Sequence, residues 1–224
     1  MFTSFKLTDL NQSRCEILRQ PSSTRPTLWV VEENGSRAVI KDFSKNGFLF
    51  RNIVGRFLIW REKKAYRKLK GVKGIPRYYH IIGGLAIVLE QISGRTIEGL
   101  ESEKPLGEDF FKDLKEVVES FHERGLAHCD LKRAPNILIG DDNEPYIVDW
   151  SSSVSEREFK FFPLNVIYNR FLQDDFNAIT KIKLRHIPDK VGPEERKNYY
   201  HRSKGEKLVR AMRDRLRELL QKIA

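Results

Sequence analysis

The chain has 224 residues, a formal net charge of +10, 40% hydrophobic residues and 32% charged residues. These proportions are typical of a soluble globular protein with one large domain or two small lobes, and they exclude a disordered chain. The longest nearly uncharged run, Ile81 to Leu89, is far shorter than the ~20 residues that a membrane-spanning helix needs. The start of the sequence has no export signal, so we expect a cytoplasmic protein.

Short runs of alternating apolar and polar residues dominate residues 1–92. They predict strands at 15–20, 28–33, 37–43, 77–82 and 85–92. Asn34-Gly35 and Gly83-Gly84 are typical of the turns between paired strands. Between the third and fourth strands the apolar period becomes helical over 53–69, and Glu62 lies in the middle of an apolar face with Leu58 and Tyr66. We therefore expect about five antiparallel strands plus one helix in this part.

After Ser93-Gly94 the pattern changes from strands to helices, which predicts a second unit over 93–224. A helix over 108–124 has six large apolar residues on one face, and Gly125 ends it. These six residues are Phe110, Phe111, Leu114, Val117, Val118 and Phe121. A strand pair at 136–139 and 145–149 follows, and then helices over 164–185 and from 193 onward. The expected fold class is α+β, with a reduced helical second unit.

The end of the chain is basic. Residues 181–224 contain 14 Lys and Arg against 6 Asp and Glu, so they carry 14 − 6 = +8 of the net charge. Between Leu208 and Ile223 the apolar residues form one helical stripe, which most often packs against the rest of a protein. Such a basic helix can also lie on an anionic membrane surface or, less favoured here, bind nucleic acid.

Polar residues interrupt the apolar runs at a few positions. A lysine in the run Ala38 to Lys41 is costly to bury unless it meets an anion, and Glu62 could provide one. Asn136 and Asp149 offer the hard oxygen ligands that Mg²⁺ takes together with water and phosphate oxygens. Asp130 lies near them in sequence and could accept a proton from an attacking hydroxyl. These are the parts that phosphoryl transfer requires.

On these residues the chain resembles the protein-kinase-like superfamily. The run ending in Lys41 is similar to its lysine-bearing strand, and Glu62 is similar to the helix partner of that lysine. The stretch from His128 to Lys132 is similar to the catalytic loop, and Asn136 and Asp149 are similar to the metal ligands. The resemblance covers about residues 15–149, in the same order as in the family, and it implies a two-lobed fold that binds ATP and Mg²⁺.

The resemblance also implies roles for single residues. Lys41, held by Glu62, would bind the α- and β-phosphates of ATP. Asp130 would orient and deprotonate the acceptor hydroxyl, and Lys132 would steady the transferred phosphoryl group. The backbone from Glu90 to Ile92 would meet the adenine. Val39 would line the adenine pocket.

More narrowly, the chain resembles the atypical branch that includes RIO kinases and the bacterial lipopolysaccharide kinases. It departs from most kinases by lacking a glycine-rich phosphate loop. The segment Pro21 to Thr27 would replace that loop, as the serine-rich loop of RIO kinases does. The residues expected to contact phosphate there are Ser22, Ser23 and Thr24.

The motifs around the metal ligands depart from the family as well. Asp149 is followed by Trp150-Ser151, where Phe-Gly is usual. Asn136 follows Asp130 by six positions, where five are usual. The extra residue leaves open a pseudokinase, a protein that binds nucleotide or acts as a scaffold without turnover.

The sequence identifies the phosphate donor better than the acceptor. Resemblance to lipopolysaccharide kinases favours a sugar or glycolipid hydroxyl, and a membrane-bound location at the inner surface would suit such an acceptor. A lysine two positions after Asp130 is similar to Ser/Thr protein kinases, so a protein hydroxyl stays open. An RNA-associated kinase, as among RIO proteins, is a further alternative.

Overall fold

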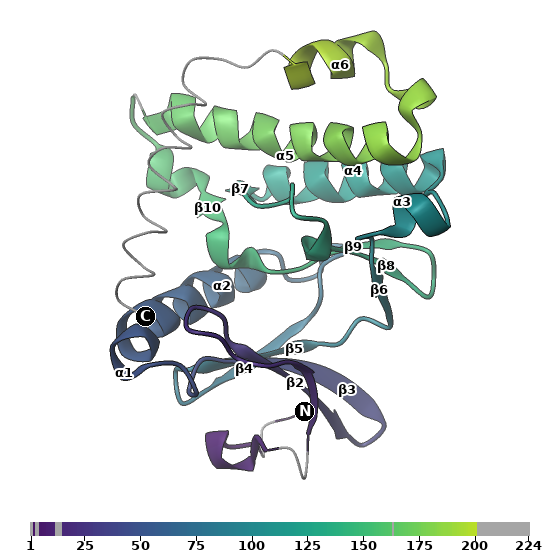
Figure 1. The fold of residues 1–224 in the computed structure, drawn as a ribbon. Helices are drawn as coiled ribbons and strands as arrows, with labels where there is room; N and C mark the ends of the chain where they lie inside the picture. Colours follow the sequence, from purple (N-terminus) through teal and green to yellow (C-terminus); the bar gives the residue numbers. More distant parts are fainter. Residues whose placement is uncertain (1, 3–4, 12–14, 163, 201–224) are drawn as a thin grey trace. The chain divides into compact units, whose positions relative to one another are not determined.

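The computed structural model describes residues 2, 5–11, 15–162 and 164–200. Contacts divide this part of the chain into two compact units. The first comprises the residues up to Lys64 together with Arg77–Gln91, and the second comprises Ala65–Pro76 and the residues from Ile92 onward (Figure 1). Among the described residues, no helix combines the length and apolarity needed to cross a membrane. The predicted apolar stripe between Leu208 and Ile223 lies outside the described residues.

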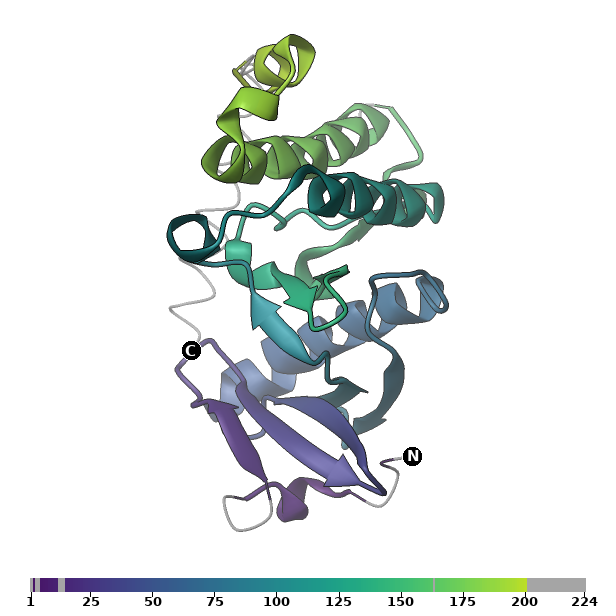
Figure 2. The ribbon, with the colours of Figure 1, turned by 90° about the vertical axis from the view of Figure 1, so that its right-hand side faces the viewer.

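The first unit is built on an antiparallel sheet with the strand order β1-β2-β3-β5-β4 (Figure 2). The strands are β1 (Glu16–Arg19), β2 (Thr27–Glu33), β3 (Ser36–Asp42), β4 (Tyr78–Ile82) and β5 (Ala86–Glu90). Asn34 and Gly35 both have positive φ, at 52° and 72°, as do Gly83 and Gly84 at 57° and 69°. Two such residues make the tight turn whose twist matches paired strands. The predicted sheet of five strands is confirmed.

One face of this sheet carries the apolar core of the first unit. Alternation along β3 points Ala38 and Ile40 into that core, and both are fully buried. Val39 and Lys41 therefore project from the opposite face of the same strand. The other core residues come from the neighbouring strands and the start of the chain: Phe2, Leu10, Cys15, Trp29, Val31, Ile82, Ala86 and Val88.

The helix that follows β3 begins earlier than the predicted residue 53. It starts as α1 (Phe48–Phe50), passes through a π-helical turn at Arg51–Gly55, and continues as α2 (Arg56–Lys68). Within α2, Ile59 is buried, whereas Leu58, which the sequence predicts on the apolar face, is half-buried. Glu62 lies on the buried face, as predicted, with 0% of its surface exposed.

The second unit combines helices with small sheets. Strands β6, β8 and β9 form one antiparallel sheet, and β7 pairs with β10. The strands are β6 (Gly94–Thr96), β7 (Leu126–Ala127), β8 (Ile137–Gly140), β9 (Pro145–Ile147) and β10 (Val154–Ser155). The helices are α3 (Leu100–Glu103), α4 (Glu108–Glu123), α5 (Leu164–His186) and α6 (Pro193–Tyr200).

Helix α4 is the centre of the second unit. All six of its predicted core residues are buried, and it packs against α5 and β9 (Figure 2). Gly125 ends it with a φ of 63°, a conformation that favours glycine. The segment from His128 to Asn136 leaves β7 beside this helix pair and leads into β8. The fold is therefore α+β, as predicted.

Candidate active site

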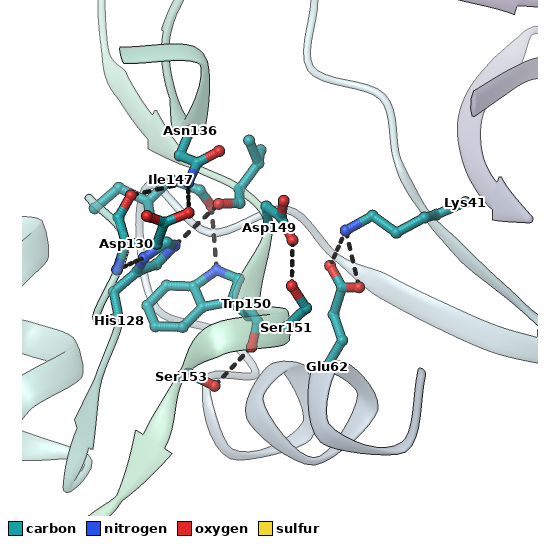
Figure 3. A network of polar contacts seen from close by, with 11 residues as sticks. Lys41, Glu62, His128, Asp130, Asn136, Ile147, Asp149, Trp150, Ser151 and Ser153 are labelled. Carbon is teal, nitrogen blue, oxygen red and sulfur yellow. Dashed lines mark hydrogen bonds and ion pairs between the residues drawn. The ribbon is translucent and has the colours of Figure 1, made fainter. Parts of the chain in front are cut away.

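In the first unit, Lys41 and Glu62 form a buried ion pair. Lys41 Nζ lies 2.8 Å from Glu62 Oε1 and 2.9 Å from Oε2 (Figure 3). The side chains are 11% and 0% exposed. Strand β3 supplies the lysine and the inner face of α2 supplies the glutamate, because Glu62 lies on the apolar stripe of that helix. The ion pair predicted from the sequence is confirmed.

The residues expected around adenine are placed by the same sheet. Val39 lies on the same face of β3 as Lys41 and pairs with Leu89 of β5. The backbone N–H of Glu90 donates to Arg77 O at 2.8 Å, and its carboxylate accepts the Arg77 N–H at 2.9 Å. An adenine contact at Glu90 would therefore not use that N–H. Ile92 is the first residue of the second unit after β5.

The loop with Ser22, Ser23 and Thr24 forms a closed turn. Ser22 and Arg25 exchange backbone hydrogen bonds of 3.1 and 3.3 Å. Asn46, which is 6% exposed, holds this turn. Its Nδ2 donates to the carbonyls of Ser22 at 2.7 Å, Ser23 at 3.2 Å and Arg25 at 3.1 Å. Sequence reasoning missed Asn46, because a lone Asn before Gly47 indicates only a turn.

In the second unit, His128 is a buried structural residue. Its ring is 0% exposed and packs edge-on against Trp150, with ring centroids 4.7 Å apart. Nε2 lies 3.0 Å from the Val148 carbonyl, and Nδ1 lies 3.3 Å from the Asp130 backbone N–H. Because a carbonyl only accepts and an N–H only donates, Nε2 carries the ring proton. His128 thus joins the loop to the end of β9.

Asp175 on α5 anchors the same loop. It is 1% exposed and accepts the backbone N–H of His128 at 2.8 Å and of Cys129 at 3.0 Å. Cys129 has a φ of 67°, and such a conformation costs a non-glycine residue about 1–3 kcal/mol. The charged acceptor stabilises this turn of the backbone. Sequence reasoning missed Asp175, although it lies on a buried helix face with Tyr168 and Ile179, the signal that identified Glu62.

Asp130 lies at the centre of the second unit's polar cluster. Burial raises the pKa of its carboxyl, and the nearby Asp149 raises it further, whereas Arg133 and His128 lower it. Arg133 Nη1 lies 3.4 Å from Asp130 Oδ2. A carboxylate with a raised pKa is a better proton acceptor than an ordinary aspartate, which suits a general base.

The extra residue before Asn136 does not separate it from Asp130. A 3₁₀ turn at Ala134–Asn136 takes up the added length. Asn136 Nδ2 then donates to the Asp130 carbonyl at 2.9 Å and lies 3.4 Å from Asp130 Oδ2. The six-residue spacing therefore still brings Asn136 next to Asp130, as the resemblance to kinases implies, although this spacing was the reason to consider a pseudokinase.

Asn136 and Asp149 form a donor set that fits Mg²⁺. The amide nitrogen of Asn136 is directed to Asp130, so its Oδ1 points away from that residue (Figure 3). Asp149 has a φ of 64° and is held by Ser151, whose Oγ donates to Asp149 Oδ1 at 2.7 Å. One carboxylate, one amide oxygen, and water or phosphate oxygens make up a usual magnesium shell. Among the described residues, no group of three or more His, Cys, Asp or Glu side chains could hold a metal ion by itself.

The structure therefore gathers the predicted site residues within each unit. In the first unit, Val39 and Lys41 share one sheet face and Glu62 lies on α2, whereas the Glu90 side chain lies on the opposite face, because Glu90 pairs with Ala38. The other predicted residues of this unit are in the Ser-rich turn. In the second unit Asp130, Asn136 and Asp149 lie together where the loop meets the β8–β9 hairpin. Lys132 is exposed on that loop, and its carbonyl accepts Lys181 Nζ at 3.2 Å.

A sheet with a buried lysine–glutamate pair, and a loop and hairpin with this Asp, Asn and Asp order, define the protein-kinase-like class. The RIO domain family model matches residues 51–195, more than half of the chain. The chain therefore belongs to the RIO domain family. The matched range includes Glu62, Asp130, Asn136 and Asp149, and it begins after Lys41.

Two curated proteins are similar to this chain at low identity. A probable serine/threonine-protein kinase of fowlpox virus is 27% identical over 141 residues, which cover 58% of this chain and 45% of the viral protein. The 3-deoxy-D-manno-octulosonic acid kinase of Vibrio parahaemolyticus is 23% identical over 147 residues, which cover 58% of this chain and 61% of that enzyme. The chain thus spans about half the length of the curated relatives that it matches.

Proposed function

We propose that this chain is an ATP- and Mg²⁺-dependent kinase that transfers a phosphoryl group to a hydroxyl acceptor. The observation that carries this proposal is the cluster of Asp130, Asn136 and Asp149, in which a base with a raised pKa adjoins two oxygen ligands. The buried Lys41–Glu62 pair supports it independently, since it presents a fixed cation suited to phosphate. Residues 1–92 would act as the nucleotide-binding lobe and residues 93–224 as the catalytic lobe.

The site residues would divide the reaction among them. Lys41, fixed by Glu62, binds the α- and β-phosphates and orients the triphosphate. Asp130 accepts the proton of the acceptor hydroxyl while the hydroxyl oxygen forms a bond to the γ-phosphorus of ATP. The bond between the γ-phosphorus and the oxygen that leaves with ADP breaks. Lys132 neutralises charge on the transferred group. Asn136 and Asp149 would hold Mg²⁺, which supplies charge neutralisation on the phosphate oxygens.

The Ser-rich turn would close over the phosphates. Its backbone is already fixed by Asn46, so its hydroxyls and amides need little ordering when nucleotide binds. Val39, Glu90 and Ile92 would contact the adenine.

A sugar or glycolipid hydroxyl is the acceptor that we favour. The Vibrio relative is named for a sugar acid, whereas the viral relative is named as a protein kinase, and both identities are low. We place the protein in the cytoplasm, with a peripheral position at the inner membrane surface for a lipid-linked acceptor.

Calorimetric titration with Mg²⁺-ATP, paired with transfer of labelled γ-phosphate to a panel of sugar, glycolipid and protein acceptors, tests this function. We expect Mg²⁺-dependent binding that weakens in Asp149→Ala and a transfer activity that disappears in Asp130→Asn. Nucleotide binding without any Asp130-dependent transfer would instead identify a pseudokinase. Absence of nucleotide binding would contradict the proposal altogether.

A further inference from the structure

A cavity of about 300 Å³ opens beside the catalytic loop, entirely within the second unit. Its walls come from the loop itself, from the segment before and within α3, and from the C-terminal half of α5. The charged residues that line it are Glu98, Glu101, Lys132, Arg133, Lys181 and Arg185. The segment Arg133 to Pro135, which contains the extra residue before Asn136, forms one wall.

The cations of this cavity crowd one another. Burial lowers the pKa of Lys181, and the neighbouring charges of Arg185 and Lys132 lower it further. The carboxylate of Glu101 lies 3.7 Å from Arg185, longer than a normal hydrogen bond. Lys181 Nζ is directed to a neutral group, the Lys132 carbonyl. With four cations against two carboxylates, the cavity favours an anionic ligand.

The cavity is connected to the catalytic carboxylate. Arg133 lines the cavity and also lies 3.4 Å from Asp130 Oδ2. Asp130 does not itself line the cavity, so an acceptor whose anionic group enters the cavity would have to extend along Arg133 to bring a hydroxyl to Asp130. That is the position in which an acceptor hydroxyl must lie to lose its proton.

We propose that this cavity binds the anionic group of the phosphate acceptor. The proposal rests on the proposed kinase function and narrows its substrate to hydroxyl compounds that carry an oxyanion, either a carboxylate or a phosphate. Lys181 and Arg185 contact that oxyanion and determine specificity. Neutral hydroxyl compounds bind poorly, because they leave the crowded cations uncompensated.

Binding is measured without ATP, so that it does not depend on turnover. Calorimetry with 3-deoxy-D-manno-octulosonic acid, its neutral methyl ester and glucose 6-phosphate distinguishes a carboxylate ligand from a phosphate ligand. We expect at least one anion to bind, and the ester to bind roughly tenfold more weakly than the acid if the carboxylate is the ligand. Lys181→Gln and Arg185→Gln each weaken anion binding by roughly tenfold, whereas Lys112→Gln, an exposed cation on α4, does not.

Two outcomes overturn the cavity's role: neither anion binds, or both cavity variants bind as well as Lys112→Gln. Thermal unfolding of each variant confirms that it is folded. If anion binding depends on Lys181 and Arg185 but no phosphoryl transfer is found, the kinase function is contradicted and the role of the cavity as an anion site stands. If the protein transfers phosphate to neutral acceptors and both variants retain this activity, only the role of the cavity in acceptor binding is contradicted.

A second inference rests on the outer face of α1 and α2, in the first unit. Large apolar residues recur there at helical spacing and are exposed. Their exposed fractions are 74% for Phe48, 52% for Leu49, 60% for Ile53, 51% for Phe57 and 52% for Trp60. Burying these side chains would contribute about 1.5–3 kcal/mol each, so leaving them in water indicates a contact surface.

Cations accompany this apolar face. Arg51, Arg61 and Lys64 lie over the rings of Phe48, Phe57 and Trp60, at 5.4, 5.7 and 5.4 Å from the ring centroids. Between residues 48 and 64 the sequence has five Lys and Arg, and the one acidic residue, Glu62, is buried against Lys41. Exposed aromatic rings with flanking cations are the composition of a helix that lies in a membrane interface.

We infer that this face binds an anionic lipid surface. The rings enter the headgroup region, and the cations contact lipid phosphates. This inference does not depend on kinase activity, and it places the surface on α1 and α2 rather than on the C-terminal segment.

The fluorescence of Trp60 in the presence of lipid vesicles tests the inference. One set of vesicles is phosphatidylcholine alone, and the other contains about 30% phosphatidylglycerol, so that anionic contacts dominate. The other two tryptophans, Trp29 and Trp150, are buried, so Trp60 reports the surface and Trp60→Phe is the blank. We expect a blue-shifted emission with anionic vesicles, weaker at high salt, and roughly tenfold weaker binding in Phe57→Ser. Leu18→Ser, a change at an exposed apolar residue of β1, leaves binding unchanged.

Three outcomes contradict lipid binding. Equal binding to neutral vesicles removes the role of charge. If Trp60 fluorescence is protected from quenchers when no vesicles are present, another segment of the chain covers the face. Dimers that dissociate in Phe57→Ser indicate that a second copy covers it.

Discussion

Replacing Glu62 by Gln removes the anion from the buried Lys41 pair and leaves the shape of the side chain unchanged. Lys41 Nζ would lose a carboxylate that contacts it at 2.8 and 2.9 Å, in a position where its side chain is only 11% exposed. Removing one partner of a buried ion pair costs about 3–5 kcal/mol, because the remaining buried charge loses the anion that contacts it. We therefore expect Glu62→Gln to destabilise the protein by that amount.

The free energy of deprotonating Lys41 sets an independent upper limit on this destabilisation. A buried lysine that loses its contacting anion can release its proton instead, and at pH 7 this costs an ordinary lysine about 4.6 kcal/mol, or ~1.36 kcal/mol for each of ~3.4 pH units. The destabilisation therefore stays below about 5 kcal/mol. In contrast, the exposed pair of Arg37 and Glu16, whose side chains are 49% and 61% exposed, should contribute about 0–1 kcal/mol.

Urea unfolding of Glu62→Gln and the matched control Glu16→Gln measures both effects. The double variant Lys41→Met/Glu62→Leu should recover most of the stability, since apolar residues of similar volume replace buried pairs at little cost. It should not recover phosphoryl transfer. A loss below about 1 kcal/mol in Glu62→Gln, equal to that of the control, would show that the pair is hydrated and the burial argument wrong.

The remaining predictions concern the groups that position the site. Arg133→Gln removes a cation that lowers the pKa of Asp130, so the acid limb of the kcat/KM profile should move to higher pH; an unchanged limb would exclude Asp130 as the titrating base. Asp175→Asn should cost about 1.5–3 kcal/mol in urea unfolding and lower kcat with little change in ATP affinity, because two backbone N–H groups lose a charged acceptor. Asn46→Ala should raise the KM for ATP while kcat changes little, and an unchanged KM would remove its role in holding the Ser-rich turn.

Much of the fold could be predicted from local patterns. Paired strands with two-residue turns such as Asn34-Gly35 and the six-residue face of α4 depend on short-range periodicity, and the structure has them as expected. The start of the long helix could not be predicted, because exposed apolar residues such as Phe48 hide the helical period and the π-helical turn shifts it. Strands of two or three residues, such as β7, β10 and β6, carry too few side chains to show a period.

Some residues of the candidate site could likewise be predicted from the sequence, and others could not. Glu62 was predictable because a carboxylate on an apolar helix face needs a cation, and the lysine of the preceding strand was near in sequence. Asp175 shows the same signal, but besides the His122 ring at 3.1 Å its partners are the backbone N–H groups of His128 and Cys129, almost fifty positions earlier, which no side-chain pattern reveals. Asn46 likewise acts on carbonyls of a distant turn. Groups that bind backbone are thus the ones that sequence reasoning misses.

The most direct test of the proposed chemistry compares wild-type protein and Asp130→Asn in the transfer of labelled γ-phosphate from Mg²⁺-ATP to a hydroxyl-bearing sugar acid or sugar phosphate. We predict a labelled acceptor with the wild type, and a rate lower by about 10²–10⁴ in Asp130→Asn at unchanged ATP affinity. Equal rates for the two proteins, or ATP binding with no labelled acceptor in either, would contradict the role of Asp130 as the base of a kinase.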